Sequence, residues 1–490
     1  MKDNKYQLVD AYDKFEDDEL FEKFSFIRAF TFIYLSTVFI IALLIFLFLF
    51  FKVPELFSLG FYLKFLVQIA SFVMLGCFLY LSFKEIFKRS NSHFLELKRS
   101  DDSEIFNLVD EVWDRAGMEK SYRLFVTPEV NAYAGLNYRL FRKSVPTISL
   151  GILLLKHFTK EELQSVIAHE IGHVKGEHSL KIKNARNIIS VSKSLLKLIK
   201  FPGLSHLIVE LDALLFSIFK RFELEADELE YELTKPEDVK GSFNKFCALK
   251  GCEDRAFDSL HGIFFDSSKH EKAIQLILDN ISSLYRSDLR PLLAKINFHK
   301  SDFYNVFHPS YDIRLKRVNQ DYGFSELDVM TDSLICEEKY SSFCSKINER
   351  IIGNWKECGE KGKKLRSDFE KLKAKENKSQ EELWELYNIA VELSDQSTEE
   401  ILRAYKYTYD DSRGSFDLAL YDFKRGDFEK CIEILVKSRC IEDFYPPELY
   451  LLQLAYRCHG EKVLAKSYEH LCRDTEWKTG ITPDIYTLSA

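Results

Sequence analysis

Two long apolar runs stand apart from the rest of the chain. Residues 29–51 contain no charged side chain, and residues 65–83 contain only Gln68 as a strongly polar one. A helix of about 20 apolar residues spans the hydrocarbon core of a bilayer. The pattern therefore predicts a transmembrane hairpin at residues 29–95, although a buried core helix is the alternative for the second run.

Basic side chains give this hairpin an orientation. They cluster at residues 1–28 and after residue 83, whereas the connecting loop carries only Lys52 and Lys64. Basic flanks stay on the cytoplasmic side of a membrane. We therefore expect residues 1–28 to be a cytoplasmic segment of a multi-pass integral protein of the plasma or inner membrane. The lipid bilayer is then a partner, and the rest of the chain faces the cytoplasm.

Residues 96–325 mix helical and strand patterns. Thr159 followed by Glu162 is a capping box, and apolar residues recur at helical spacing after it, which predicts a helix at residues 160–175. Residues 123–130 and 145–150 have the pattern of strands. One of these two segments is expected to form a sheet edge.

From about residue 326 onward the strand signal disappears. Residues 326–380 are highly charged and predict a helical linker. Residues 381–490 contain a weak repeat with a period of 34, in which Leu420, Gly426 and Cys431 recur as Leu454, Gly460 and Ala465. This period predicts tetratricopeptide-like helical repeats, with chance helical amphipathicity as the alternative.

The composition narrows the classes of function. The formal net charge of -8 leaves no overall basic field for phosphates, so nucleic acid is not an expected partner. The chain has 10 cysteines but no CxxC pair. This usage fits a reducing compartment better than a disulfide framework or a cysteine-rich zinc module.

The strongest chemical signal is the sequence HEIGH at residues 169–173, inside the predicted helix. A spacing of four residues turns a helix through about 400°, which puts His169 and His173 on one face where they can share a metal. Glu170, about 100° further round, can reach a water on that metal without being a ligand.

A catalytic zinc has three protein ligands, so a third should lie further along the chain. Glu223 in the sequence RFELEAD is the candidate, and Asp227, one turn later, can accept the free N–H of a ligating imidazole as a second-shell residue. An acidic, solvated helix face is the alternative interpretation of this segment.

HEIGH at 169–173 together with ELEAD at 223–227 resembles the membrane gluzincin metallopeptidases, the family of HtpX-type heat-shock proteases and CAAX prenyl proteases. The resemblance covers about residues 100–320. It includes a segment similar to the family's NAFA-like substrate edge, formed by Asn131, Ala132, Tyr133 and Ala134, and a motif similar to HPxxxxR, formed by His308, Pro309 and Arg314.

This resemblance implies one Zn²⁺ per chain, bound by His169, His173 and Glu223. It also implies that Glu170 is the catalytic base and that His308 and Arg314 lie near the catalytic cleft. The expected fold is α+β, with a mainly helical, zincin-like (gluzincin) metalloprotease domain at residues 96–325. The transmembrane hairpin precedes this domain, and an all-α, repeat-like domain follows it.

We therefore expect a membrane-anchored zinc endopeptidase that hydrolyses membrane or misfolded proteins in protein quality control, with a possible protein partner on the repeats. Two alternatives remain at this point. One is an interaction scaffold that works through its helical repeats and keeps a vestigial metal site. The other is CAAX-type processing of prenylated proteins, which two membrane spans disfavour.

Overall fold

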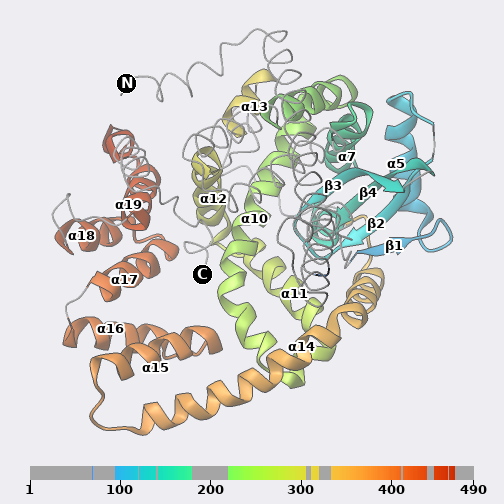
Figure 1. Cartoon of the computed structure of the whole chain (residues 1–490). Helices are drawn as coiled ribbons and strands as arrows, with labels where there is room; N and C mark the ends of the chain where they lie inside the picture. Colours follow the sequence, from blue (N-terminus) through green and yellow to red (C-terminus); the bar gives the residue numbers. More distant parts are fainter. Residues whose placement is uncertain are drawn as a thin grey trace, which may run out of the picture. The chain divides into compact units, whose positions relative to one another are not determined.

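The structure is a computed structural model that describes residues 69, 94–119, 121–139, 142–178, 219–304, 311–318, 320, 333–409, 412–438, 446–461 and 463–468 (Figure 1). The chain divides into two compact units, residues 1–92 with 177–222 and residues 93–176 with 223–490. The two predicted membrane spans lie outside the described residues, except for Ile69. Among the described residues, no helix has the length and apolarity needed to cross a bilayer.

Four strands form a small sheet in the second unit, in the order β1-β2-β4-β3. Strands β2 and β4 pair in parallel, whereas β1 and β3 pair antiparallel with their neighbours. The prediction that one of the two strand segments forms a sheet edge is therefore wrong, because β2 and β4 are both central. The edge beside α7 is β3, formed by residues that lie between these two strands in the sequence. The bounds are Leu95–Leu97 for β1, Arg123–Thr127 for β2, Ala132–Arg139 for β3 and Arg142–Gly151 for β4.

One face of the sheet is buried because alternate side chains of neighbouring strands meet there. Leu124 and Val126 of β2 lie opposite Ile148 and Leu150 of β4, and all four are fully buried. They share a core with α5 (Ser103–Arg115), α6 (Ile152–His157) and α7 (Lys160–Lys175). The sheet therefore supports α7, the helix that carries the HEIGH sequence (Figure 1).

A series of helices follows α7 along the chain. Residues 219–233 are helical, and α10 packs against α7, α11 and α12. This packing places residues far apart in sequence beside α7. The bounds are Pro236–Phe264 for α10, Ser267–Lys272 for the 3₁₀ helix η2, Ala273–Tyr285 for α11, Arg290–Tyr304 for α12 and Tyr311–Arg317 for α13.

The long helix α14 (Glu337–Ala374) contacts η2 through one of its faces. The buried amide of Asn348 accepts a hydrogen bond from the N–H of Ile274 (3.2 Å) and donates to the carbonyl of His270 (2.9 Å). A Cβ atom at Gly362 would lie 2.3 Å from the carbonyl oxygen of Phe265, so this contact requires glycine. Much of the predicted charged linker at 326–380 is thus a single helix, held to its neighbours by specific contacts.

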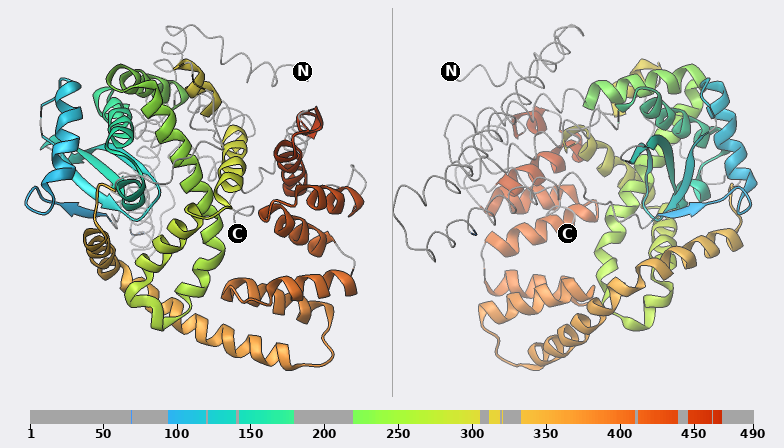
Figure 2. Two further views of the ribbon diagram at one scale, coloured as in Figure 1. Left: turned by 180° about the vertical axis from the view of Figure 1, so that it is seen from behind. Right: turned by 45° about the vertical axis from the view of Figure 1, so that its right-hand side comes forward.

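Shorter helices, α15–α19 among them, follow α14 in the described residues (Figure 2). Gly426 follows α17 with φ of 86°, and Gly460 follows α19 with φ of 101°, so two positions 34 residues apart both end a helix in the left-handed region. The tetratricopeptide-like repeat itself stays a prediction. The bounds are Gln380–Leu393 for α15, Thr398–Thr408 for α16, Ser412–Lys424 for α17, Phe428–Ser438 for α18 and Pro446–His459 for α19.

Candidate metal centre

Helix α7 begins where the sequence predicts it. The hydroxyl of Thr159 accepts a hydrogen bond from the N–H of Glu162 (3.1 Å), and the carboxylate of Glu162 accepts one from the N–H of Thr159 (2.7 Å). This reciprocal capping box satisfies two backbone donors that a helix start leaves unpaired. Lys245 of α10 also binds the Glu162 carboxylate at 2.7 Å. The start of the motif helix is therefore fixed both locally and by α10.

The helix at residues 219–233 approaches α7 closely because both helices have a small residue at the contact. A Cβ atom at Gly172 would lie 2.7 Å from Cα of Ala226, closer than real Cβ atoms come. Glycine in α7 and alanine in the second helix thus permit this approach. The result is that Glu223, one turn before Ala226, reaches the two histidines of α7.

Three side chains converge between these two helices. Nε2 of His169 lies 3.4 Å from Oε2 of Glu223, and Nε2 of His173 lies 3.4 Å from Oε1 of the same carboxylate. The two Nε2 atoms are 3.1 Å apart. One ligand atom from each of the three residues lies within 4.8 Å of the others. The structure therefore brings together the three residues that the sequence assigns to the metal.

A second layer of charged groups lies behind His169. Its Nδ1 atom is 3.0 Å from Oδ1 of Asp227, as the helical spacing predicts. The guanidinium of Arg314 in α13 donates to the same carboxylate, with Nε 2.9 Å from Oδ2. Arg314 is buried against the ring of Phe243, and its Nη2 atom lies 3.2 Å from Nδ1 of His169. Arg314 is thus a neighbour of a ligand, on the Nδ1 side of the imidazole.

The electrostatics of this cluster favour bound positive charge. Burial opposes protonation of His169, but hydrogen bonds to Asp227 and Glu223 outweigh it and raise the pKa of His169 well above its ordinary value. Burial also opposes ionisation of Asp227, yet the charge of Arg314 keeps the pKa of Asp227 below its ordinary value. A divalent cation competes with a proton for such an imidazole, so the same field that holds the proton attracts a metal.

The donor set fits Zn²⁺. Two imidazole nitrogens and one carboxylate are a ligand set of catalytic zinc, which keeps a fourth position for water or substrate. Three buried carboxylates, those of Glu223, Asp227 and Glu230, face the guanidinium of Arg314 and the His169 imidazole among the described residues. Buried like charges destabilise one another, and a divalent cation compensates them.

The other residues that the sequence assigns to the site lie in α7, in or next to β3, or outside the described residues. Glu170 is buried in α7 directly after His169. Asn131 precedes β3, and Ala132, Tyr133 and Ala134 belong to this edge strand, which packs against α7. His308 lies outside the described residues.

The open side of β3 can be assigned from its hydrogen bonds. The carbonyl of Asn131 accepts from the N–H of Gly151 in β4 (2.9 Å), so this carbonyl points into the sheet. Backbone groups alternate along a strand, which turns those of Ala132 and Ala134 toward the open side. The N–H of Ala132 is bound to the side chain of Asn131 at 3.0 Å. Ala134 is therefore the first position with an outward N–H beyond that local hydrogen bond.

Sequence reasoning missed Glu230, a carboxylate that is only 2% exposed. Its Oε2 atom lies 3.7 Å from Nδ1 of His169, and burial raises the pKa of Glu230 to about 7. A signal was present, because Glu223, Asp227 and Glu230 follow one another at spacings of four and three on one helix face. The acidic composition of the segment concealed it.

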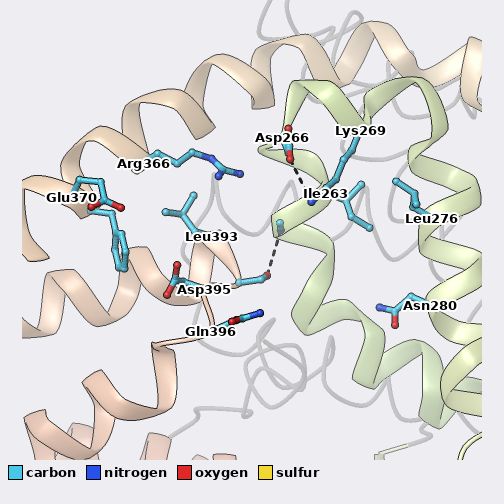
Figure 3. Close-up of a pocket in the computed structure, with 13 residues that line it drawn as sticks. Ile263, Asp266, Lys269, Leu276, Asn280, Arg366, Glu370, Leu393, Asp395 and Gln396 are labelled. Atoms are coloured by element: carbon cyan, nitrogen blue, oxygen red, sulfur yellow. Dashed lines mark hydrogen bonds and ion pairs between the residues drawn. The ribbon is translucent and has the colours of Figure 1, made fainter.

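A separate cavity of about 770 Å³ lies between α10, α11 and the 3₁₀ helix η2 on one side and α14 and α15 on the other (Figure 3). Arg366 and Glu370 of α14 face Ile263 of α10 and Lys269 of η2 there. None of the predicted site residues lines this cavity. The metal centre and the cavity are thus distinct features of the second unit.

Comparison with known proteins agrees with this geometry. Residues 99–320, less than half of the chain, match the family model described as Peptidase family M48. A curated relative, "Protease HtpX homolog 1" from Sulfurisphaera tokodaii, is 41% identical over 85 residues. That match covers 16% of this chain and 26% of the relative, so the chain spans about a quarter of the relative's length. The family match indicates a metallopeptidase-type domain at residues 99–320.

Proposed function

We propose that the chain is a zinc-dependent endopeptidase that cleaves protein substrates. The observation that carries this proposal is the convergence of His169, His173 and Glu223 between two closely packed helices, with Asp227 and Arg314 behind them. The match of residues 99–320 to Peptidase family M48 supports a metallopeptidase. The relative described as a protease supports the same class of reaction.

Each residue of the site has a defined task in this proposal. Bound Zn²⁺ supplies Lewis-acid polarisation of the scissile carbonyl and of the attacking water. Glu170 accepts a proton from that water and then delivers it to the leaving amine. Asp227 accepts the Nδ1 proton of His169, which fixes the tautomer with a free Nε2 lone pair for the metal. Arg314 keeps Asp227 ionised and oriented.

Substrate would bind as an extended strand beside β3. The outward backbone groups of an edge strand pair with any peptide, so affinity depends little on substrate sequence. This mode suits a protease that acts on misfolded or membrane proteins, the substrate class that we propose. The roles of Asn131, Ala132, Tyr133 and Ala134 in binding belong to this proposal.

Membrane anchoring is a further part of the proposal. The apolar runs at residues 29–51 and 65–83 and the basic residues that flank them support a two-span anchor with the peptidase facing the cytoplasm. Tags at both ends of the chain should then be inaccessible from outside intact cells, whereas a tag near Leu56 should be accessible. Labelling of the C-terminal tag from outside would invert this topology.

The alternative of an interaction scaffold with a vestigial metal site has less support. A site without function would be free to lose its buried carboxylates, whose burial is costly unless they are paired or bind metal. Here Glu170, Glu223 and Asp227 are all retained and buried. CAAX-type processing has no specific observation in its favour among the described residues.

Metal analysis combined with a cleavage assay tests the proposed function. Purified protein should contain one zinc per chain and should cleave casein. A chelator should abolish cleavage, and added Zn²⁺ should restore it. A metal-free preparation that cleaves casein at the same rate would overturn the proposal.

A further inference from the structure

Glu230 occupies an unusual environment for a carboxylate. It is 2% exposed, and its Oε2 atom makes no hydrogen bond with any described residue. That atom lies 3.7 Å from Nδ1 of His169 and 4.0 Å from Nη2 of Arg314. Removing a carboxylate from water without full hydrogen bonding is costly. Glu230 is therefore placed where its charge acts mainly on the metal-ligating imidazole and its neighbour.

The other oxygen of Glu230 is held by the helix that carries both histidines. The hydroxyl of Ser165 in α7 donates to Oε1 of Glu230. Ser165 lies one turn before His169, and Glu230 lies one turn after Asp227. The Ser165–Glu230 pair thus links the two ligand-bearing helices on the Nδ1 side of His169.

We infer that Glu230 and Ser165 form a positioning pair that determines how tightly the site holds Zn²⁺. Ser165 fixes the Glu230 carboxylate beside Nδ1 of His169, next to the carboxylate of Asp227, and a bound divalent cation favours the ionised form of Glu230. A carboxylate at this place increases the electron density that the imidazole offers through Nε2 and attracts a divalent cation. This inference rests on the proposed zinc site, and it assigns metal retention to residues outside the ligand set.

Replacement of Glu230 by glutamine tests the inference, because glutamine keeps the shape and removes the charge. Residues behind a metal ligand typically contribute about 10- to 100-fold to metal affinity. We expect Glu230→Gln to raise the zinc Kd at least about tenfold, measured by competition with a chromophoric chelator. The matched control is Glu228→Gln on the same helix, since the Glu228 side chain is 66% exposed and pairs with Arg317. The control should leave the zinc Kd unchanged.

A double-variant cycle tests whether the two residues act as a pair. Ser165→Ala should weaken zinc binding in the otherwise unaltered chain, but it should add little to Glu230→Gln, because the two changes remove one interaction. The melting temperature of each metal-free variant should stay within a few degrees of the parent. This separates weaker metal binding from a loss of folding.

These measurements distinguish a failure of the positioning role from a failure of the proposed function. A parent chain that binds zinc and a Glu230→Gln variant with the same Kd would overturn the positioning role but leave the proposed function intact. Equal weakening by Glu228→Gln would overturn it as well, because a general surface-charge effect would then explain the result. A parent chain that binds no zinc would overturn both the proposed function and this inference.

Discussion

The metal centre and the C-terminal helices differ in how closely they group buried charged side chains. Around α7, buried ionisable side chains from this helix, residues 223–233, α10 and α13 pair with one another across helices. In helices α15–α19 the two core clusters consist of Leu, Ile, Ala, Cys and aromatic side chains. Asp422, Glu448 and Gln453 are buried there as well, and Asp422 pairs with the half-exposed Arg403, whereas the Lys430–Asp427 ion pair lies at the surface. Buried charges are therefore grouped at the metal centre, where their pairing offsets part of the free energy of desolvation.

The largest expected effect is the loss of catalysis when the water-activating carboxylate is neutralised. Glu170→Gln should lower kcat by about 10²- to 10⁴-fold while zinc remains bound, because the residue moves a proton without ligating the metal. Glu223→Ala should lose both zinc and activity. Zinc content and casein cleavage of both variants measure this difference. Full zinc occupancy in Glu223→Ala would remove that residue from the ligand set.

The second expected effect tests whether the two regions are independent. Leu452 of α19 is fully buried in an apolar cluster, so Leu452→Ala should destabilise the C-terminal helices by about 2–5 kcal/mol. The zinc Kd should not change, because none of the ligands belongs to that cluster. Hydrogen exchange in α17–α19 and a zinc titration measure the two effects separately. A matching loss of zinc affinity would show that the regions are coupled.

A third and smaller effect concerns the close contact of the ligand-bearing helices. A methyl group at Gly172 would force Ala226 to shift, so Gly172→Ala should cost about 1–3 kcal/mol of stability and weaken zinc binding. The control is Gly135→Ala, where the nearest atom would be the Thr147 hydroxyl at an ordinary 3.7 Å. Thermal melts with and without zinc compare the two. Equal melting temperatures for both variants would mean that the helix contact tolerates a methyl group.

The smallest expected effect concerns the edge strand. Proline at position 134 removes one outward N–H, so Ala134→Pro should raise KM for an unfolded substrate several-fold, as expected for about 1 kcal/mol per hydrogen bond. Ala132→Pro should have less effect on substrate, because the Ala132 N–H is already bound to Asn131. Steady-state kinetics with casein measure both. Unchanged KM in Ala134→Pro would place the substrate elsewhere.

Part of this architecture can be predicted from patterns of neighbouring residues in the sequence. The capping box at Thr159 predicts the start of α7, and the spacing within HEIGH predicts that His169 and His173 lie on one face of it. These inferences need only helical periodicity, which is a property of neighbouring residues. The spacing from Glu223 and Asp227 indicates which helix face carries Glu230, but it does not predict the burial of Glu230, which involves Ser165, a residue 65 positions earlier that meets it only in the folded chain.

Other features also depend on distant contacts. The requirement for glycine at position 172 arises from Ala226, which no local pattern reveals. The edge position of β3 depends on how four strands are ordered, and strand patterns do not encode that order. The charged sequence of residues 326–380 predicts a helix, but it does not predict the contacts that α14 makes with the residues around η2.

The contacts of α14 have a consequence for insertions and deletions. Asn348, Gly359 and Gly362 all face the region around η2, and they are spaced by 11 and 3 residues on a helix of 38 residues, about 57 Å long. Each added or deleted residue rotates everything beyond it by about 100°. A single-residue indel between Asn348 and Gly359 would therefore turn the glycines away from η2 and direct bulky side chains at Phe265. A length change of seven residues, close to two full turns, would restore the face but displace the glycines by about 10 Å along the helix axis, so the stretch between Asn348 and Gly359 should tolerate no change in length.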